Sequence, residues 1–365
     1  MALAPQSAGL SRRALLQGTL ASALAYAARP ALAVPRVDRL SLQVLVDNAT
    51  FGPFLEDARL PGLRVERITG KLDHGRMSAH AMMAEFGLSL LAESQKGAQV
   101  RRVLVDFGYS PEVLANNLAM LEVDPALLDA AVLSHGHLDH YGGFPGLFQG
   151  RAPRPHLPLL VGGEEAFCER VALIGNPPPL MGTLDRRALA RAGFEVRIAP
   201  APSLVAEHAF TTGVIPLRSA ERAAIPTQMR PGHGCDAARL SEAKRSAAQL
   251  PDDGEHELAT CYAVEGLGLV VIASCSHRGV LNSVARAQEV SGVQRVHAVV
   301  GGFHLVRPRT EAEARQTVAE LATLDPTYVI PMHCTGEVFI AEALRRMPQK
   351  VVRPYVGTRF TFSAT

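Results

Sequence analysis

The stretch that decides the fold is LSHGHLDHYGG, residues 133–143. Three histidines and one aspartate crowd into it: His135, His137, Asp139 and His140. An apolar run precedes them and two glycines follow, so we predict that they stand on a turn at the end of a buried strand. In an extended segment, residues two apart point to the same side. His135, His137 and Asp139 can therefore face one ion, and a turn at the glycines would bring Asp139 and His140 to a second.

Other histidines occupy similar positions. The chain has 13 histidines, and several follow predicted strands, where ligands gather in α/β sheets. Neutral imidazoles suit zinc, iron or manganese, and a carboxylate adds a hard oxygen ligand. The competing interpretation, a set of solvated loop histidines with a capping aspartate, does not explain this repeated placement. The histidines at or just beyond predicted strand ends are His135, His137, His140, His277, His304 and His333.

The order of predicted elements is that of an α/β protein. Strands follow strands in the N-terminal third, and strands alternate with helices in the C-terminal half, which favours two sheets with outer helices. Residues 150–257 give weaker signals, and we treat them as a substrate-side insertion within one domain. The predicted strands are 41–46, 88–93, 100–105, 128–133, 159–161, 194–198, 211–217, 258–264, 268–273, 296–300 and 328–331. The predicted helices are 111–121, 163–171, 280–290, 310–324 and 336–346, with a loop at 229–255.

Residues 1–33 are predicted to be an export signal and are excluded from the fold. Arg12 and Arg13 precede an apolar run, residues 14–28, that is shorter than the roughly 20 residues needed to span a bilayer. A small-residue cleavage pattern closes the segment. The paired arginines indicate the twin-arginine route, so we expect a periplasmic mature protein, residues 34–365, without membrane contact. The alternative is an amphipathic helix that stays on the protein.

Composition narrows the range of partners. The formal charge is +2, and no basic stripe of the kind that binds nucleic acid is present, so we expect a small-molecule substrate. The five cysteines are widely and irregularly spaced, which predicts no disulfide framework, and their odd number leaves at least one free thiol. The oligomeric state is not predicted.

The pattern His135-x-His137-x-Asp139-His140 resembles the metal-binding signature of the metallo-β-lactamase fold superfamily. Further pieces resemble one subgroup, the dihydropteroate-synthase-like proteins related to the archaeal synthase of ribofuranosyl-aminobenzene phosphate pterin compounds. The resemblance covers most of residues 40–360 and is weakest at 175–255. Its pieces are Asp106-Phe107-Gly108, Leu133-Ser134-His135, Gly142-Gly143, Ser274-Cys275-Ser276-His277, Gly301-Gly302-Phe303-His304-Leu305 and His333-Cys334-Thr335-Gly336.

The resemblance implies a four-layer αββα sandwich with a metal site on one edge, between the sheets. It implies two divalent ions, with zinc as the first choice and iron or manganese as alternatives. The implied ligands are His135, His137 and His277 for one ion, and Asp139, His140 and His333 for the other.

Three more residues keep two interpretations each. His304 competes with His277 as the third ligand of the first ion. Cys275 stands where the superfamily usually has an acidic bridging ligand, so it is either a thiolate ligand or a small buried residue. Asp106 either orients a ligating histidine through a hydrogen bond or caps the turn before Pro111.

These expectations favour a metal-dependent hydrolase. A metal ion lowers the pKa of its bound water from about 15.7 to about 7, so a metal-bound hydroxide could attack an ester, lactone, amide or phosphoester. Asp139 would bind metal and orient that hydroxide. The runner-up is a transferase of the dihydropteroate-synthase-like type acting on a pterin, and the third interpretation is a non-catalytic metal-binding protein.

Overall fold

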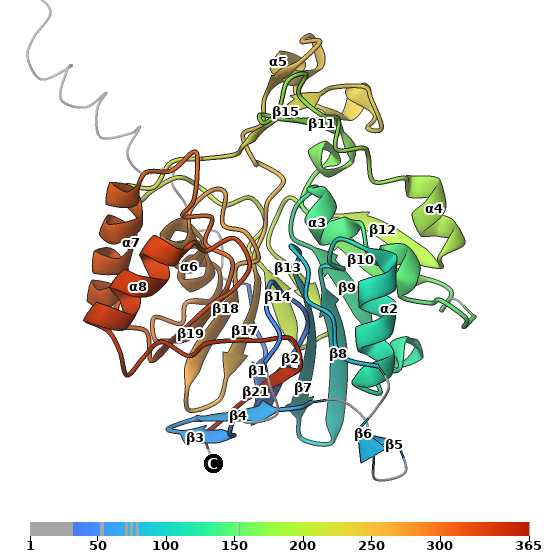
Figure 1. Cartoon of the computed structure of the whole chain (residues 1–365). Coiled ribbons are helices and arrows are strands. Elements are labelled where there is room, and N and C mark those ends of the chain that lie inside the picture. The colour runs from blue at the N-terminus through green and yellow to red at the C-terminus, as the bar shows by residue number, and fades with distance from the viewer. Residues whose placement is uncertain are drawn as a thin grey trace, which may run out of the picture. The chain divides into compact units, whose positions relative to one another are not determined.

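Two β-sheets lie face to face in the computed structural model of the chain (Figure 1). The larger sheet has nine strands; its first three neighbour pairs are parallel and the others are antiparallel. Its order is β12 (Phe194–Ile198), β10 (Leu157–Val161), β9 (Ala130–Leu133), β8 (Gln99–Val105), β7 (Ser89–Lys96), β2 (Arg39–Val46), β21 (Thr358–Ser363), β4 (Leu63–Arg67) and β3 (Ala58–Leu60).

The second sheet has seven strands and ends in three parallel neighbours, β18, β19 and β20. Because these strands run in the same direction, their carboxyl ends meet at one edge of the sheet. The order is β13 (Ser203–Val205), β14 (Ala209–Thr211), β17 (Thr260–Val264), β18 (Gly268–Ile272), β19 (Val296–Gly301) and β20 (Tyr328–Pro331), with β1 (Arg36–Val37) paired to β17.

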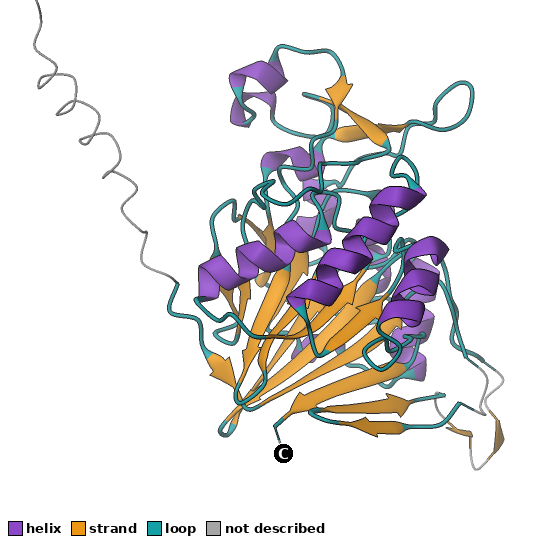
Figure 2. Cartoon of the chain, turned by 90° about the vertical axis from the view of Figure 1, so that its left-hand side faces the viewer, coloured by secondary structure: helices purple, strands orange, loops and turns teal. Residues whose placement is uncertain are grey.

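Helices cover the outer face of each sheet, which completes the expected order of layers. Figure 2 shows one group of helices lying across strands of a sheet, and Figure 1 shows the other group on the opposite side. The first group is α6 (Val280–Ser291), α7 (Glu311–Leu324) and α8 (Glu337–Arg346), and the second is α2 (Pro111–Met120), α3 (Leu138–Tyr141) and α4 (Arg186–Arg191).

Three buried apolar clusters hold the four layers together. The central cluster fills the space between the sheets and includes Val132 and Val300, one from each. A second cluster joins the nine-stranded sheet to α2 and α4, and a third joins the seven-stranded sheet to α6, α7 and α8. Each fully buried valine, leucine or phenylalanine stabilises the fold by about 1.5–3 kcal/mol relative to an exposed one. The pattern of apolar and polar residues along each strand and helix therefore determines which faces of the sheets and helices pack together.

The insertion differs most from the sequence prediction. The helix predicted at 163–171 is wrong: a 3₁₀ turn, η3 (Glu164–Phe167), is followed by strand β11 (Glu169–Ala172). Strand β11 pairs with β15 (Thr227–Arg230), which in turn pairs with β16 (Leu250–Pro251), and these long-range pairings leave no local sequence signal. The loop predicted at 229–255 is interrupted by part of this sheet, by η4 (Ala237–Arg239) and by α5 (Glu242–Arg245).

The strand predicted at 211–217 is also wrong beyond its first residue, because β14 ends at Thr211. Gly213 has a φ of +60°, and an added Cβ there would lie 2.6 Å from the Pro200 carbonyl oxygen. This close approach needs glycine and takes the chain out of the sheet. Short elements complete the fold: η1 (Pro125–Leu127), η2 (Phe144–Gly146), β5 (Leu72–Asp73) and β6 (Arg76–Met77).

Two expectations about single residues are corrected. Cys168 and Cys235 form a disulfide across 67 residues, although their spacing indicated none. It joins the start of β11 to the segment after β15, so it ties the insertion together. Because His156, His208 and His233 lie in the insertion, the sequence predicts surface positions for them, but His208 is buried and its Nδ1 lies 3.0 Å from the Ser94 hydroxyl.

The predicted export signal falls almost wholly outside the described residues and stays a prediction. Within the described part of the chain, none of the helices has the length and apolarity needed to cross a membrane. Residues Leu32–Thr365 form one compact unit. The structure describes residues 32–51, 55–69, 72–73, 76–77, 80–152 and 154–364.

Candidate metal centre

The motif of residues 135–140 lies at the carboxyl end of β9, where the chain turns into α3. His137 is the residue that precedes the first turn of α3, and Asp139 and His140 are consecutive within that turn. Gly136 separates His135 from His137. An added Cβ there would lie 2.2 Å from the Ala166 carbonyl oxygen, so only glycine fits. The turn carries all four polar side chains into the interior, where each is buried.

Three more histidines reach the same region from the other sheet. His277, His304 and His333 follow β18, β19 and β20, whose carboxyl ends share one edge. His304 and His333 have φ values of +43° and +46°, in the left-handed region that costs a non-glycine residue roughly 1–2 kcal/mol. Such strain gathers at functional sites, where the surroundings over-determine the conformation.

The first donor group consists of His135, His137 and His277, whose three donor nitrogens lie within 4.8 Å of one another. Within the described residues, Nε2 of His135 and Nε2 of His277 are buried and have no hydrogen-bond partner. Leaving a buried polar atom unpaired costs about 1–3 kcal/mol, which an ion would relieve. Burial lowers the pKa of all three rings, that of His137 to about 3, so they are in the neutral form that binds metal.

The other nitrogen of each ring is held by a hydrogen bond from behind. This arrangement fixes the tautomer and aims the free nitrogen at the centre of the group. Behind His137, the Thr227 hydroxyl donates its proton to Asp252, so the Thr227 oxygen accepts the N–H of His137 Nε2. The Nδ1 atom of His137 is then free to bind an ion. The contacts are Ser134 Oγ to His135 Nδ1 (3.0 Å), Thr227 Oγ1 to His137 Nε2 (3.1 Å) and the Ala224 carbonyl oxygen to His277 Nδ1 (3.2 Å).

The second donor group consists of Asp139, His140 and His333. Asp139 Oδ2 lies 3.1 Å from His333 Nε2 and 3.7 Å from His140 Nε2, and the two imidazole nitrogens are 3.2 Å apart. Burial opposes a charge on His333, yet Cys334 and Asp139 raise its pKa to about 9. A cation that binds here would displace the proton on His333, and the negative charge of Asp139 beside the ring favours either occupant.

Asp106 lies directly behind the second group and is fully buried. Its carboxylate accepts hydrogen bonds from the Ser134 backbone N–H (2.7 Å), the Ser134 hydroxyl (2.7 Å) and His140 Nδ1 (2.8 Å). Of the two interpretations of Asp106, this geometry favours orientation of a histidine over a cap before Pro111. The Ser134 hydroxyl, by accepting from His135, connects Asp106 to both donor groups.

We expect Asp106→Asn to weaken metal binding about 10- to 100-fold, the usual effect of losing a hydrogen-bonding partner of a ligand. An amide replaces one acceptor oxygen by a donor, so Ser134 and His140 cannot both be satisfied. Competition with a chelating dye measures the affinity. Asp129→Asn is the control, because Asp129 accepts a backbone N–H from Arg102 at the opposite end of β9. Equal affinities in both variants would contradict this role.

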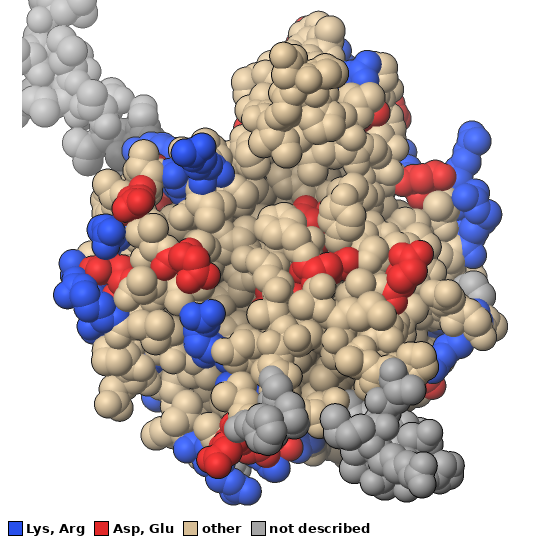
Figure 3. All heavy atoms as spheres, in the orientation of Figure 1, with Lys and Arg blue, Asp and Glu red and all other residues tan. Residues whose placement is uncertain are grey.

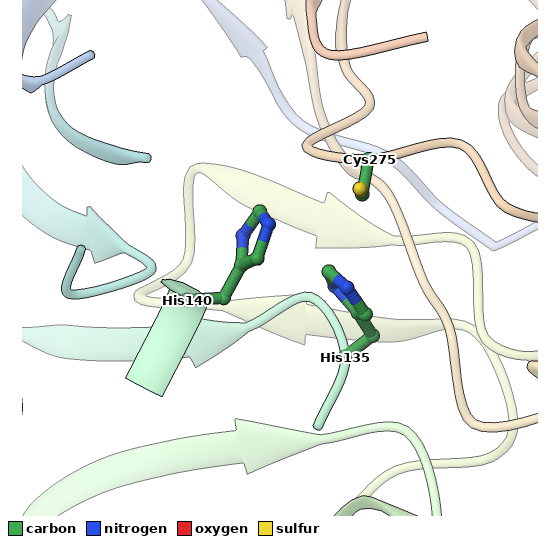
Figure 4. A group of neighbouring side chains, drawn as sticks. All are labelled: His135, His140 and Cys275. Atoms are coloured by element: carbon green, nitrogen blue, oxygen red, sulfur yellow. The ribbon is translucent and has the colours of Figure 1, made fainter. Parts of the chain in front are cut away.

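Cys275 and His304 lie beside the two groups. Cys275 is buried, its Sγ is 3.1 Å from Cys334 Sγ, and it is 3.6 Å from His304 Nδ1. The structure groups His277, and not His304, with the two histidines of the motif. Figure 4 shows His135, His140 and Cys275 as neighbours: His140 comes from α3, and the other two come from the loops after β9 and β18. Metal ligation by any of these residues stays a prediction.

Several supporting residues escaped the sequence analysis. Arg170 is fully buried and contacts Asp252 (Nε to Oδ2, 2.7 Å), which stands behind Thr227 and His137. These residues lie in the insertion, and no local pattern marks them. Glu257 was missed as well, and it accepts the backbone N–H of His277 at 2.8 Å.

Asp47 and Asn48 hold the His333 loop. Asp47 Oδ1 accepts the His333 N–H at 2.9 Å, and Asn48 Nδ2 donates to the His333 carbonyl at 2.8 Å. Both follow β2, so the nine-stranded sheet fixes a ligand candidate of the other sheet.

Apolar side chains are exposed near the donor groups. The ring of Phe86 is 58% exposed and lies 4.6 Å from the ring of His333. Leu173 follows β11, and its N–H donates to the Pro226 carbonyl, next to the Thr227 that contacts His137. Leu173 and the adjacent Ile174 are both more than half exposed. In Figure 3 the lobe that carries β11, β15 and α5 presents mostly uncharged side chains to the viewer.

Comparison with known proteins agrees with this geometry. Residues 99–170 match the model of the Metallo-beta-lactamase superfamily. The 7,8-dihydropterin-6-methyl-4-(beta-D-ribofuranosyl)-aminobenzene-5'-phosphate synthase of Methanocaldococcus jannaschii is 27% identical over 257 residues, 69% of this chain and 82% of that protein. An uncharacterized protein of the same organism is 25% identical over 256 residues, 69% of this chain and 85% of that protein.

A solved structure extends the similarity to the whole fold. The crystal structure of a metal-dependent hydrolase of the beta-lactamase superfamily superposes with a TM-score of 0.62 at 22% identity, covering 88% of this chain and 98% of that chain. These findings confirm the expected αββα fold and the resemblance drawn from the sequence.

Proposed function

We propose that this chain, a member of the metallo-β-lactamase fold superfamily, is a metal-dependent hydrolase of a small molecule. One observation carries the proposal: two buried groups of three donors lie side by side, with the His135 and His140 rings 4.2 Å apart. Imidazole and carboxylate donors fit zinc first, with iron or manganese as alternatives. The two groups are His135, His137 and His277, and Asp139, His140 and His333.

Divalent ions at these positions would lower the pKa of a coordinated water to about 7 and polarise the oxygen of the bond to be cleaved. The protein's own part is to hold the donors and to handle the proton. Burial raises the pKa of Asp139, but His140 and His333 hold it well below its usual range. Asp139 is therefore ionised at neutral pH and can accept a hydrogen bond from the attacking water, which orients it.

The substrate class follows from the bond type and the surroundings. An ester, lactone, amide or phosphoester carries the oxygen that such ions polarise. Two exposed apolar features favour a substrate with an apolar portion: Phe86 beside His333, and Leu173 with Ile174, where the Leu173 backbone bonds to Pro226 next to Thr227. We therefore place the apolar part of the substrate under the lobe formed by the insertion.

A transferase acting on a pterin is the second candidate. The observation that favours it is the synthase of Methanocaldococcus jannaschii, which matches 69% of this chain. In that case the ions would assist a leaving group rather than activate water. The same donor residues would serve both reactions, so only the products distinguish them.

The test is to strip the protein of metal, reload it with zinc, manganese or iron(II), and follow the products from two substrate panels. One panel holds esters, lactones, amides and phosphodiesters; the other pairs a pterin diphosphate with an aminobenzoate. We expect hydrolysis of at least one class, lost without metal and restored with it. Joining of pterin to aminobenzoate would establish the second candidate, and a fully metallated protein inactive on both panels would indicate a non-catalytic metal-binding protein.

A further inference from the structure

We propose that Cys275 supplies a thiolate that bridges the two ions. This inference rests on the proposed function, because it presumes that both donor groups bind metal. The geometric basis is that Cys275 Sγ lies within 4.8 Å of donor nitrogens of His135 and His140, one from each group. Figure 4 shows this arrangement, with the sulfur facing the two imidazoles. A ligand atom shared in this way can contact an ion on either side.

The remaining donor sets point to the same sulfur. Cys275 groups with His277 and His304 on one side, and with His333 and Cys334 on the other, again within 4.8 Å. Asp139 is the only carboxylate in any such group of the described residues, and it belongs to the second ion. None of the acids among the described residues therefore groups with donors of both sets, whereas the Cys275 sulfur does.

The local backbone fixes the sulfur in place. Cys275 lies shortly after β18, and Ser276 has a φ of +56°, which turns the chain sharply between Cys275 and His277. The Ser276 hydroxyl donates to the Gly302 carbonyl at 2.8 Å, which ties this turn to the end of β19. The Cys275 side chain is buried, so the surrounding chain restricts where the sulfur can point.

Two side chains support the sulfur from behind. Cys334 Sγ lies 3.1 Å from it and packs against it, and His304 Nδ1 lies 3.6 Å from it, so the imidazole N–H can donate to a thiolate at Cys275. Hydrogen bonds to a ligand sulfur spread its charge and fix its direction. His304 thus acts as a positioning residue for Cys275, which accounts for its place beside the ligand groups rather than within the first one.

The sulfur changes which metal the site prefers. A thiolate is a softer ligand than a carboxylate and favours zinc, iron or cobalt over manganese or magnesium. Binding replaces the thiol proton by the ions, and that proton passes to solvent. No bond other than S–H is broken, and no oxidant is needed.

Cobalt(II) provides a direct readout, because a thiolate bound to cobalt gives a charge-transfer absorption in the near ultraviolet. We would titrate the reduced, metal-free protein with cobalt(II) and count bound ions by elemental analysis. If Cys275 bridges, the absorption rises through both equivalents. If it serves one ion alone, the absorption stops after one equivalent, and the bridging role is overturned without any variant being made.

Variants then identify the sulfur. We expect Cys275→Ser to lose most of the absorption, and Cys275→Asp to lose it while still binding two ions. Cys261→Ser is the matched control, since Cys261 is equally buried but lies within β17, and it should leave the spectrum unchanged. Absorption that survives in Cys275→Ser, or two bound ions without absorption in the unaltered protein, would overturn the inference alone. A protein that binds no ions would overturn the proposed function instead.

Discussion

Alanine in place of His135 or His277 should leave the protein with one ion fewer and lower kcat/KM by about a thousandfold or more. Each substitution removes a donor whose Nε2 is buried and unpaired within the described structure. Loss of the ion removes transition-state stabilisation worth several kcal/mol, and about 4 kcal/mol corresponds to a thousandfold. Elemental analysis of the dialysed variants counts the ions, and steady-state kinetics gives the rate.

His297→Ala is the matched control for both variants. His297 is also buried and lies on β19, but its Nε2 bonds to the Gly62 carbonyl at 3.2 Å, away from the donor groups. It should keep both ions and full activity. Unfolding measured without metal separates loss of folding from loss of binding. If His277→Ala keeps two ions, His277 is not a ligand of the first ion, and His304 becomes the candidate for the third ligand.

The choice between His277 and His304 illustrates what the sequence could determine. Both follow consecutive parallel strands, β18 and β19, and both come after a short turn. Periodicity places them at the same edge of the sheet, but it cannot say which ring faces His135. That depends on the left-handed backbone at Ser276 and His304, which tertiary contacts stabilise.

Local patterns predicted the parts of the fold that are built locally. Helices α6, α7 and α8 agree with the predicted ranges within two residues, because their apolar faces repeat at helical spacing. The motif of residues 135–140 was readable for the same reason: its donors are adjacent in sequence. The structure of the insertion could not be predicted in this way, because β11, β15 and the Cys168–Cys235 disulfide are defined by partners tens of residues away.

Among the residues that connect the insertion to His137, namely Arg170, Asp252 and Thr227, we expect Arg170→Met to lower the free energy of unfolding most. The Arg170 side chain is 1% exposed and pairs with Asp252, which is buried to the same degree. It also donates to the Cys168 carbonyl at 2.9 Å and lies 3.0 Å from His256 Nε2. Removing one member of a buried ion pair leaves an uncompensated charge and costs about 3–5 kcal/mol. Denaturant unfolding measures the loss.

Arg230→Met is the control, because Arg230 lies on the neighbouring strand β15 and pairs with Glu169, but its side chain is 29% exposed. A partly exposed pair is better solvated than the Arg170 pair, so this variant should lose clearly less stability than Arg170→Met. If Arg170→Met and Arg230→Met lower the free energy of unfolding equally, burial of the Arg170 pair does not add to its contribution to stability.

The double variant Arg170→Met/Asp252→Leu separates folding from function. Replacing both charges by apolar groups removes the unpaired charge, so most of the lost stability should return. Metal affinity should not return, because the Thr227 hydroxyl donates to Asp252 and accepts from His137, and that chain of hydrogen bonds is broken. We expect the affinity of the first ion to stay about 10- to 100-fold lower. Recovery of both properties would mean that Asp252 serves only to neutralise Arg170, and that His137 needs no support from the insertion.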